Sequence, residues 1–146
     1  MKKMLMILVM LLGAYTSVSA QNWLTDFNAA KTLATKENKT TLLVFQGSDW
    51  CTPCILLDRK IWSTDTFKEY AKSHYVMVKA DFPRKKQNAL SEAQQKQNND
   101  LAAKYNPNGY FPFVVVFDSK GNVIGQTGFQ EITPEEYIKL LNSFNK

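Results

Sequence analysis

Hydrophobic and polar residues follow two different periods along the chain, one typical of helices and the other of buried strands. Between Trp23 and Glu37 the apolar residues recur every three or four positions, which predicts an amphipathic helix. The apolar run within 40–46 predicts a strand that is buried on both faces. Segments 75–81 and 113–117 carry the β-branched and aromatic residues of further strands.

Capping residues and one-sided apolar positions predict more helices in the first half of the chain. Cys54, Leu57 and Ile61 share one helical face. A separate helix is expected from about Thr64, because Thr66 lies three residues before a glutamate, which is the spacing of a capping box.

The second half of the chain adds a polar helix, a hairpin and a terminal helix. Residues 91–104 have helix propensity but only a thin apolar face, so we expect this helix to be largely solvent-facing or partly mobile. The short loop 118–122 joins the strand 113–117 to a strand predicted over 123–127, which indicates a β-hairpin. Thr-Pro-Glu-Glu at 133–136 supplies an N-cap, a first-turn proline and a third-position glutamate for the last helix.

The order of these elements predicts an α/β domain. Helices alternate with strands, which implies a central mixed sheet with helices on both faces and a C-terminal β-hairpin plus helix. A length of 146 residues suits one domain. The sequence contains neither an internal repeat nor a linker, and we therefore assign a single domain to residues 21–146.

The first 20 residues have the pattern of a secretory signal peptide. Two lysines precede an unbroken apolar run of eleven residues, Met4 to Ala14, which fits an h-region and is too short to span a bilayer. Val18-Ser19-Ala20 places small residues where a signal peptidase cleaves, so cleavage is expected after Ala20. The alternative is a retained N-terminal anchor. We expect a periplasmic or secreted protein without stable membrane insertion.

Removal of this leader lowers the net charge of the chain. The full chain has 18 basic and 13 acidic residues, a net charge of +5, which would suit nucleic-acid or membrane binding. Both lysines of the leader leave with it, and the net charge falls to +3. This is an ordinary surface charge, so no nucleic-acid partner is expected.

The two cysteines of the chain, Cys51 and Cys54, form a CxxC motif that follows the predicted strand 40–46 and begins a helix. Unpaired N–H groups at a helix start stabilise negative charge, and the pKa of a CxxC thiol falls from about 8.5 to roughly 3.5–7.5. Cys51 is therefore the predicted nucleophile for a substrate disulfide, and Cys54, one turn later, is the predicted resolving thiol. Pro53 falls in the first turn, where its missing N–H is not needed.

Other interpretations of the cysteine pair have less support. A structural disulfide across so short a loop would stabilise little. Haem attachment needs a histidine after the second cysteine, and Ile55 stands there. With two thiols and one histidine, His74, we expect no metal site and no cofactor besides the redox-active disulfide Cys51–Cys54 itself.

The sequence Gly-Ser-Asp-Trp-Cys-x-x-Cys at 47–54 resembles the thioredoxin superfamily, and especially its secreted bacterial thioredoxin-like proteins. The similarity extends over about 23–144 and implies a thioredoxin-like fold. Trp50 matches the tryptophan before the nucleophile. Phe111-Pro112 matches the cis-proline segment that faces the dithiol, where the backbone would pair with an extended substrate. The substrate-binding residues that this resemblance implies are Trp50, Thr52, Pro53, Phe111 and Pro112.

The chain departs from the family pattern at three places. Phe45 stands six residues before Cys51, where well-known reductases of the family carry a buried aspartate. Lys79 is either the match for the lysine beside that aspartate or an exposed strand-end residue. Thr52-Pro53 replaces the familiar Gly-Pro, and a bulky Phe111 precedes the cis-proline position. These differences leave the redox potential and the direction of electron flow open.

Together these features predict an exported thiol–disulfide oxidoreductase of the protein-disulfide reductase or isomerase type. Its expected partners are protein thiols and disulfides and a membrane or periplasmic electron donor, and it is expected to be a monomer. The alternatives are a thioredoxin-like partner-binding module whose disulfide is idle and a dithiol protein that handles copper. The basic and polar segment 82–99 is interpreted as a solvated loop and helix, with a partner-docking arm as the alternative.

Overall fold

The computed structural model describes residues 21–146, and the predicted leader at 1–20 lies outside the described residues. Five strands form one mixed sheet in the order β1-β3-β2-β4-β5. Strands β1, β3 and β2 run parallel, whereas β4 is antiparallel to β2 and β5 to β4. The elements in chain order are β1 (Trp23–Leu24), α1 (Phe27–Glu37), β2 (Thr40–Gln46), α2 (Thr52–Leu57), α3 (Asp65–His74), β3 (Tyr75–Asp81), α4 (Glu92–Tyr105), β4 (Phe113–Phe117), β5 (Val123–Thr127) and α5 (Pro134–Asn142).

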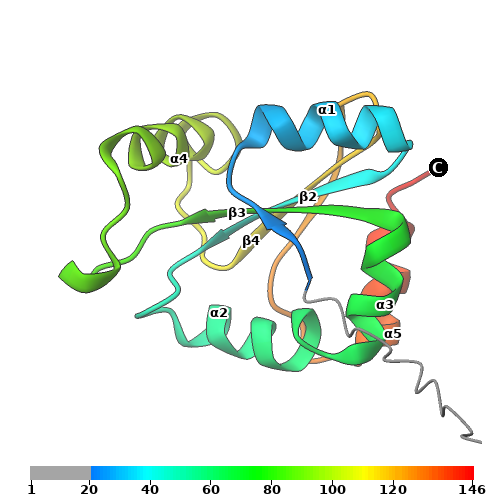
Figure 1. The fold of residues 1–146 in the computed structure, drawn as a ribbon. Helices are drawn as coiled ribbons and strands as arrows, with labels where there is room; N and C mark the ends of the chain where they lie inside the picture. Colours follow the sequence, from blue (N-terminus) through cyan, green and yellow to red (C-terminus); the bar gives the residue numbers. More distant parts are fainter. Residues whose placement is uncertain (1–20) are drawn as a thin grey trace, which may run out of the picture.

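Helices cover both faces of the sheet, which confirms the predicted fold class. Helices α1 and α4 lie on one face, and α2, α3 and α5 lie on the other (Figure 1). Each face has its own apolar core. Phe27 and Leu101 belong to the core beneath α1 and α4, and Trp62 and Tyr137 belong to the core on the opposite side.

The central strand β2 is buried on both faces, as its apolar run predicted. Leu43 and Phe45 point into the core beneath α1 and α4, whereas Leu42 and Val44 point into the core beneath α2, α3 and α5. Because side chains alternate along a strand, the last residue of β2, Gln46, is on the same side of the sheet as α2. This alternation decides which strand residue approaches the cysteines.

The start of the first helix differs from the prediction. The residues before Phe27 include the short strand β1, which pairs in parallel with β3, instead of a first helical turn. Asp26 is the reason, because its carboxylate accepts hydrogen bonds from the N–H groups of Asn28 and Ala29 and caps the helix there.

The connection between α2 and α3 also departs from the expected pattern. Helix α2 continues directly into a π-helical segment, Asp58–Trp62. The N-cap of α3 is Thr64, whose hydroxyl accepts the N–H of Phe67 at 3.3 Å. The predicted capping box at Thr66 is therefore wrong, although the helix itself begins close to the expected residue.

Helix α4 is polar, as predicted, but its inner face does not face solvent. Asn98 is only 1% exposed, and its Nδ2 donates to the backbone oxygen of Asp81 at 2.9 Å. The side chain of Gln97 accepts the N–H of Phe27 at 3.0 Å, and Gln94 donates to the loop before α1. Side-chain amides thus dock this helix beside its thin apolar face, while most of its remaining residues face solvent as predicted.

The hairpin and the last helix agree with the sequence. Strands β4 and β5 pair across the loop 118–122. The carboxylate of Asp118 accepts hydrogen bonds within that loop, which lower the pKa of Asp118 below its usual value. Thr133 and Glu136 form the predicted capping box with hydrogen bonds of 2.9 and 3.2 Å. Among residues 21–146 no helix combines the length and the apolar character that crossing a membrane requires.

Candidate active site

The two cysteines lie at the junction between β2 and α2 and form a disulfide. Cys51 is the N-cap of α2, and its sulfur accepts the N–H of Cys54 at 3.3 Å. Their Cα atoms are 5.2 Å apart. Both residues are largely covered, with Cys51 4% and Cys54 6% exposed. The sequence placed this pair correctly at the start of a helix.

This position determines what the Cys51 sulfur can do after reduction. An N-cap side chain normally supplies an oxygen that accepts a helix N–H group, and here a sulfur has that role. Partial positive charge from the first N–H groups favours a thiolate over a thiol. The geometry therefore suits nucleophilic attack by Cys51.

Trp50 is half-buried and is fixed by contacts on several sides. Its indole Nε1 donates to the backbone oxygen of Phe82 at 2.7 Å. The indole also lies so close to Gly47 that a Cβ atom at this glycine would overlap the ring. The ring of Phe111 meets it edge-on with centroids 5.5 Å apart. Trp50 thus connects the cysteine loop to two distant segments.

The cis-proline segment lies beside this loop, as the resemblance implied. The peptide bond between Phe111 and Pro112 is cis. Pro112 is buried and Phe111 is half-buried. The Phe111 ring packs against both Trp50 and Phe82, with centroid distances of 5.5 Å in each case. The structure therefore brings Phe111 next to the CxxC motif.

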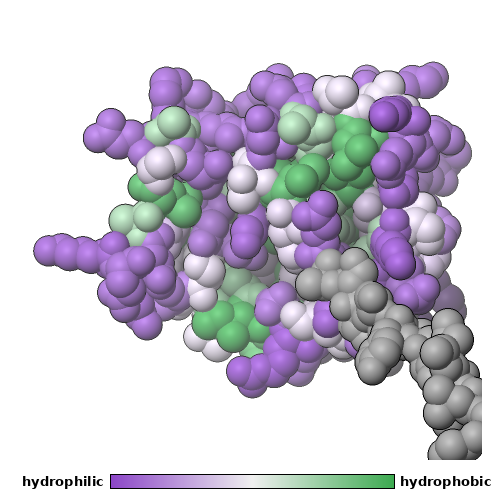
Figure 2. All heavy atoms as spheres, viewed as in Figure 1, coloured by the Kyte–Doolittle hydropathy of each residue, from purple (hydrophilic) through white to green (hydrophobic). Residues whose placement is uncertain are grey.

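Exposed side chains lie beside the cysteines in α2 and directly before Phe111 in the chain. Thr52 and Pro53 occupy the exposed first turn of α2. Ile55 is 40% exposed and Tyr110 is 57% exposed, two large apolar residues that the sequence did not single out. An apolar area is visible over the first turns of α2 (Figure 2). This surface can take up apolar side chains of a polypeptide.

Asp49 is a site residue that sequence reasoning missed. Its carboxylate accepts the backbone N–H groups of Arg84 at 2.9 Å and Lys85 at 3.0 Å, and the side-chain amide of Asn88 at 3.0 Å. These hydrogen bonds lower the pKa of Asp49 to about 2. The residue stands directly before Trp50, but nothing in the local sequence shows that it binds a segment more than thirty positions away.

The basic loop 82–88 is solvent-exposed from Arg84 onward and is also attached to the segment before the cysteines. The Arg84 guanidinium lies over the Trp50 ring, with its Cζ atom 3.7 Å from the ring centre. This is the geometry of a cation–π contact. The loop and its neighbours form a hydrophilic margin of the molecule (Figure 2). Arg84, Lys85 and Lys86 are all exposed, as the interpretation as a solvated loop predicted, and Arg84 in addition packs on Trp50.

A cavity of about 350 Å³ adjoins Cys54 and contains two charged side chains. Its lining residues are Trp23, Gln46, Ser48, Cys54, Ile55, Asp58 and Lys79. Phe45, which stood at the place of the family's aspartate by sequence counting, points into the opposite core. Gln46 is the β2 residue that lines this cavity. Lys79 lines the cavity and is only partly exposed.

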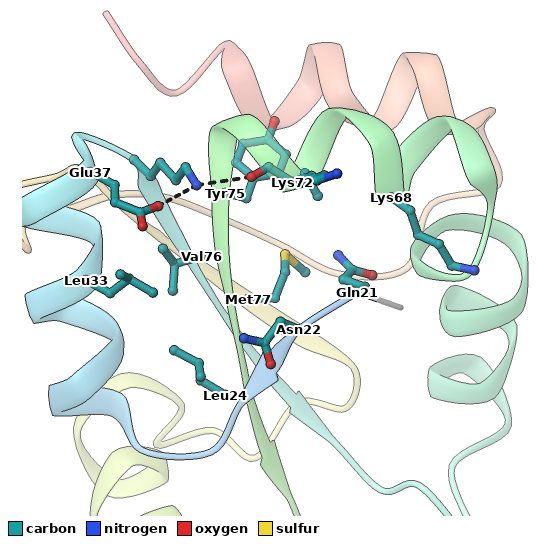
Figure 3. A pocket seen from close by; sticks show the side chains of 12 residues that line it. Gln21, Asn22, Leu24, Leu33, Glu37, Lys68, Lys72, Tyr75, Val76 and Met77 are labelled. Atoms are coloured by element: carbon teal, nitrogen blue, oxygen red, sulfur yellow. Dashed lines mark hydrogen bonds and ion pairs between the residues drawn. The ribbon is translucent and has the colours of Figure 1, made fainter. Parts of the chain in front are cut away.

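A second hollow lies at the opposite end of the sheet. It opens between α1, α3 and the start of β3 and has a volume of about 240 Å³ (Figure 3). Leu33, Val76 and Met77 form part of its apolar lining. Lys39 crosses its rim, where it donates to the backbone oxygen of Lys72 and pairs with Glu37. The cysteines follow the other end of β2, so this hollow is separate from their site.

Comparison with known families agrees with this fold and site. The family model described as Thioredoxin-like matches residues 22–119. The chain therefore belongs to the thioredoxin-like family. Within residues 21–146, no three His, Cys, Asp or Glu side chains gather as a group that could hold a metal ion.

Individual proteins of the thioredoxin fold are similar to this chain in sequence or in structure. Over 108 residues the chain is 35% identical to the disulfide bond reductase DsbH of Chlamydia pneumoniae, an alignment that covers 74% of this chain and 63% of that protein. The chain thus spans less than two thirds of this relative's length. A solved structure of a DsbH oxidoreductase has a TM-score of 0.78 at 31% identity, covering 86% and 85% of the two chains. A thioredoxin from Thermus thermophilus shares the fold, with a TM-score of 0.64 at 15% identity over 86% and 87% of the chains.

Proposed function

We propose that this protein is a thiol–disulfide oxidoreductase of the protein-disulfide reductase type. The observation that carries the proposal is the Cys51–Cys54 disulfide at the start of α2, with the Cys51 sulfur as the helix N-cap. The name of the Chlamydia pneumoniae relative, a disulfide bond reductase, supports reduction as the direction. An isomerase that uses the same chemistry is the nearest alternative.

The proposed reaction consumes the dithiol form of the protein. The Cys51 thiolate attacks one sulfur of a substrate disulfide, forms a mixed disulfide and releases the other substrate sulfur as a thiolate. Cys54 then loses its proton and attacks the Cys51 sulfur. This step restores the Cys51–Cys54 disulfide and releases the second substrate sulfur. The substrate gains two electrons and, after protonation, two thiols, and the protein loses the same two electrons.

The proton of Cys54 needs an acceptor because this thiol is buried before the second step. The cavity beside Cys54 contains Asp58 and Lys79, and its volume admits water. We assign Asp58 as the proton acceptor, acting through that cavity. Asp58 also accepts a hydrogen bond from Ser63 at 3.1 Å, which orients its carboxylate.

Proteins with accessible disulfides are the proposed substrates. Thr52 and Pro53 form the exposed first turn of α2 between the two cysteines, and the Phe111-Pro112 segment adjoins the residue before Cys51. Trp50 packs against Phe111. An extended polypeptide can lie along this surface and pair with the Phe111 backbone. This role for Trp50, Thr52, Pro53, Phe111 and Pro112 is part of the proposal.

Export is the proposed setting of the reaction. Residues 1–20 carry the lysines, apolar run and small-residue site of a signal peptide, and cleavage after Ala20 would release the domain 21–146. In the periplasm or outside the cell, a monomeric reductase needs electrons from a membrane or periplasmic donor to regenerate its dithiol. Mass spectrometry of the exported protein tests the cleavage site.

Reduction of insulin disulfides by dithiothreitol tests the enzyme proposal. The mature protein should accelerate the reaction, and the Cys51→Ser variant should not. Equal rates with both would favour a partner-binding module with an idle disulfide. The Cys54→Ser variant should accumulate mixed disulfides with its substrates, which identifies them by mass spectrometry. Stoichiometric Cu(I) binding that withstands a competing chelator, without insulin reduction, would instead support copper handling.

A further inference from the structure

The loop 82–88 presents a fixed row of positive charges at the edge of the proposed active site. Asp49 holds the backbone of Arg84 and Lys85 through two hydrogen bonds of 2.9 and 3.0 Å. Asn88, at the end of a 3₁₀ turn over Lys86–Asn88, donates to the same carboxylate. The loop is therefore attached at its beginning and its end to the residue before Trp50.

The Arg84 side chain extends this attachment to the redox motif itself. Its guanidinium stacks over the Trp50 ring, with Cζ 3.7 Å from the ring centre. The residue remains exposed, so the outer face of the guanidinium and its N–H groups are accessible. Arg84 thus places a positive charge on the tryptophan that directly precedes the nucleophilic Cys51.

Nearby acids offset the charge of this row only in part. The ionised Asp49 carboxylate attracts Lys85, but its three hydrogen bonds come from the backbone of Arg84 and Lys85 and from Asn88, so the charged ends of the three basic side chains stay available. The Asp81 carboxylate accepts the N–H and the hydroxyl of Ser48 at 2.9 and 2.6 Å. Within the described residues the salt bridges are Lys39–Glu37, Lys60–Glu131 and Lys96–Asp100, and none of them includes Arg84, Lys85 or Lys86.

We propose that Arg84, Lys85 and Lys86 form a specificity surface for acidic polypeptides. This inference rests on the proposed function, because it describes which protein disulfides the site reduces fastest. Apolar side chains of the substrate would contact Ile55 and Tyr110, which are 40% and 57% exposed. Carboxylates flanking the substrate disulfide would meet the basic row, with Arg84 able to form paired hydrogen bonds to one of them.

Three synthetic peptides provide the test. They share one disulfide-closed loop and differ only in their flanking residues, which are Glu, Gln or Lys. The second-order rate constant for oxidation of the reduced mature protein is measured with each peptide. We expect the Glu peptide to react about tenfold faster than the Lys peptide at low salt, since several surface charges act together. The difference should shrink in about 0.5 M salt.

Charge-reversal variants and a matched control show which residues cause the preference for the Glu peptide. The Lys85→Glu/Lys86→Glu variant and the Arg84→Gln variant should each reduce the ratio of the Glu-peptide to the Lys-peptide rate constants. Lys120 is exposed in the β4–β5 loop, at the opposite end of β4 from the cysteines. The Lys120→Glu variant changes the net charge by the same amount as one of the two lysine replacements and should leave the ratio unchanged. An equal reduction in the Lys120→Glu variant would overturn the assignment to this loop.

A binding measurement separates this inference from the proposed function. Fluorescence anisotropy of labelled peptides with the Cys51→Ser/Cys54→Ser variant reports recognition without chemistry. Preferential binding of the Glu peptide without any reaction of the reduced protein would support the surface and contradict the reductase proposal. Equal reaction and equal binding of all three peptides would overturn the surface and leave the reductase proposal standing.

Discussion

The carboxylate of Asp49 accepts the backbone N–H of Arg84 at 2.9 Å, across 35 positions of the chain. Through this contact the turn before the cysteines determines where the basic loop lies. The Arg84 side chain then returns to the neighbouring Trp50 ring. The redox motif and the loop 82–88 are consequently one structural unit.

Replacement of Asp49 by alanine should release the loop. The N–H groups of Arg84 and Lys85 would lose their acceptor, and their hydrogen exchange should accelerate about tenfold or more as local opening becomes easier. Exchange measured by NMR checks this. The Asp100→Ala variant, which removes an exposed carboxylate from α4, should leave both amides protected. Unchanged exchange in the Asp49 variant would contradict the anchoring role.

Acid should weaken the same anchor in a defined range of pH. Hydrogen bonds from the loop lower the pKa of Asp49 to about 2, below the value of about 3.9 in an unfolded chain. A lowered pKa means that the stabilisation is complete above about pH 4 and is lost as the pH falls toward about 2. The difference in urea midpoint between the wild type and Asp49→Asn should therefore vanish in this interval and stay constant from pH 5 to 8.

Comparison with the Asp49→Asn variant is necessary because the pKa of Asp118 is also lowered by hydrogen bonds in its own loop. That residue contributes acid sensitivity to both proteins equally, so the difference between them isolates Asp49. A constant difference in urea midpoint down to pH 2 would contradict the prediction.

Alanine at Gly47 should displace the Trp50 indole. A Cβ atom at this position overlaps the ring, and such overpacking costs about 1–3 kcal/mol in the free energy of unfolding. We expect lower stability and slower insulin reduction, measured by urea denaturation and turbidity. In a Trp50→Ala background the additional cost of Gly47→Ala should largely disappear, because the overlapping atoms are gone. If Gly47→Ala lowered the free energy of unfolding equally in both backgrounds, overlap with the Trp50 ring would not explain the loss of stability.

Removal of the Asn98 side chain should destabilise the docking of α4. The Asn98→Ala variant leaves the backbone oxygen of Asp81 without the hydrogen bond of 2.9 Å, at a cost of about 1–3 kcal/mol for a buried group. Asn99→Ala, one position further along the same helix and exposed, is the matched control and should change the unfolding free energy by less than about 0.5 kcal/mol. Similar losses in the two variants would refute a specific role for Asn98.

The Asp58→Asn variant should slow the resolving step at neutral pH. If Asp58 accepts the Cys54 proton, its loss makes release of the substrate depend on hydroxide, and the rate should rise more steeply with pH than in the wild type. Rapid-quench measurement of mixed-disulfide decay reports this step directly. The Asp65→Asn variant removes an exposed carboxylate from α3 and should retain the wild-type profile. An unaltered profile for Asp58→Asn would exclude this residue as the acceptor.

Short-range sequence patterns were sufficient to predict most of the helices and strands. The strand over 75–81 has the predicted bounds, and the Thr133 capping box forms as expected. These features depend on side chains only a few positions apart, so their spacing in sequence is also their spacing in space. The start of α1 was misplaced because Asp26 is the N-cap, and the two residues of β1 could be recognised only from their pairing with β3.

The CxxC pair and its place at a helix start follow from the sequence alone, because strand, turn and helix are contiguous there. Tertiary structure decided what surrounds the pair. The alternation of β2 turns Phe45 away and leaves Gln46 at the cavity beside Cys54. Asp49, for which no contact was predicted, and Asn98, in a helix expected to face solvent, hold distant segments together. Hydrogen bonds between residues far apart in the chain leave no period or spacing in the sequence, and only the folded chain reveals them.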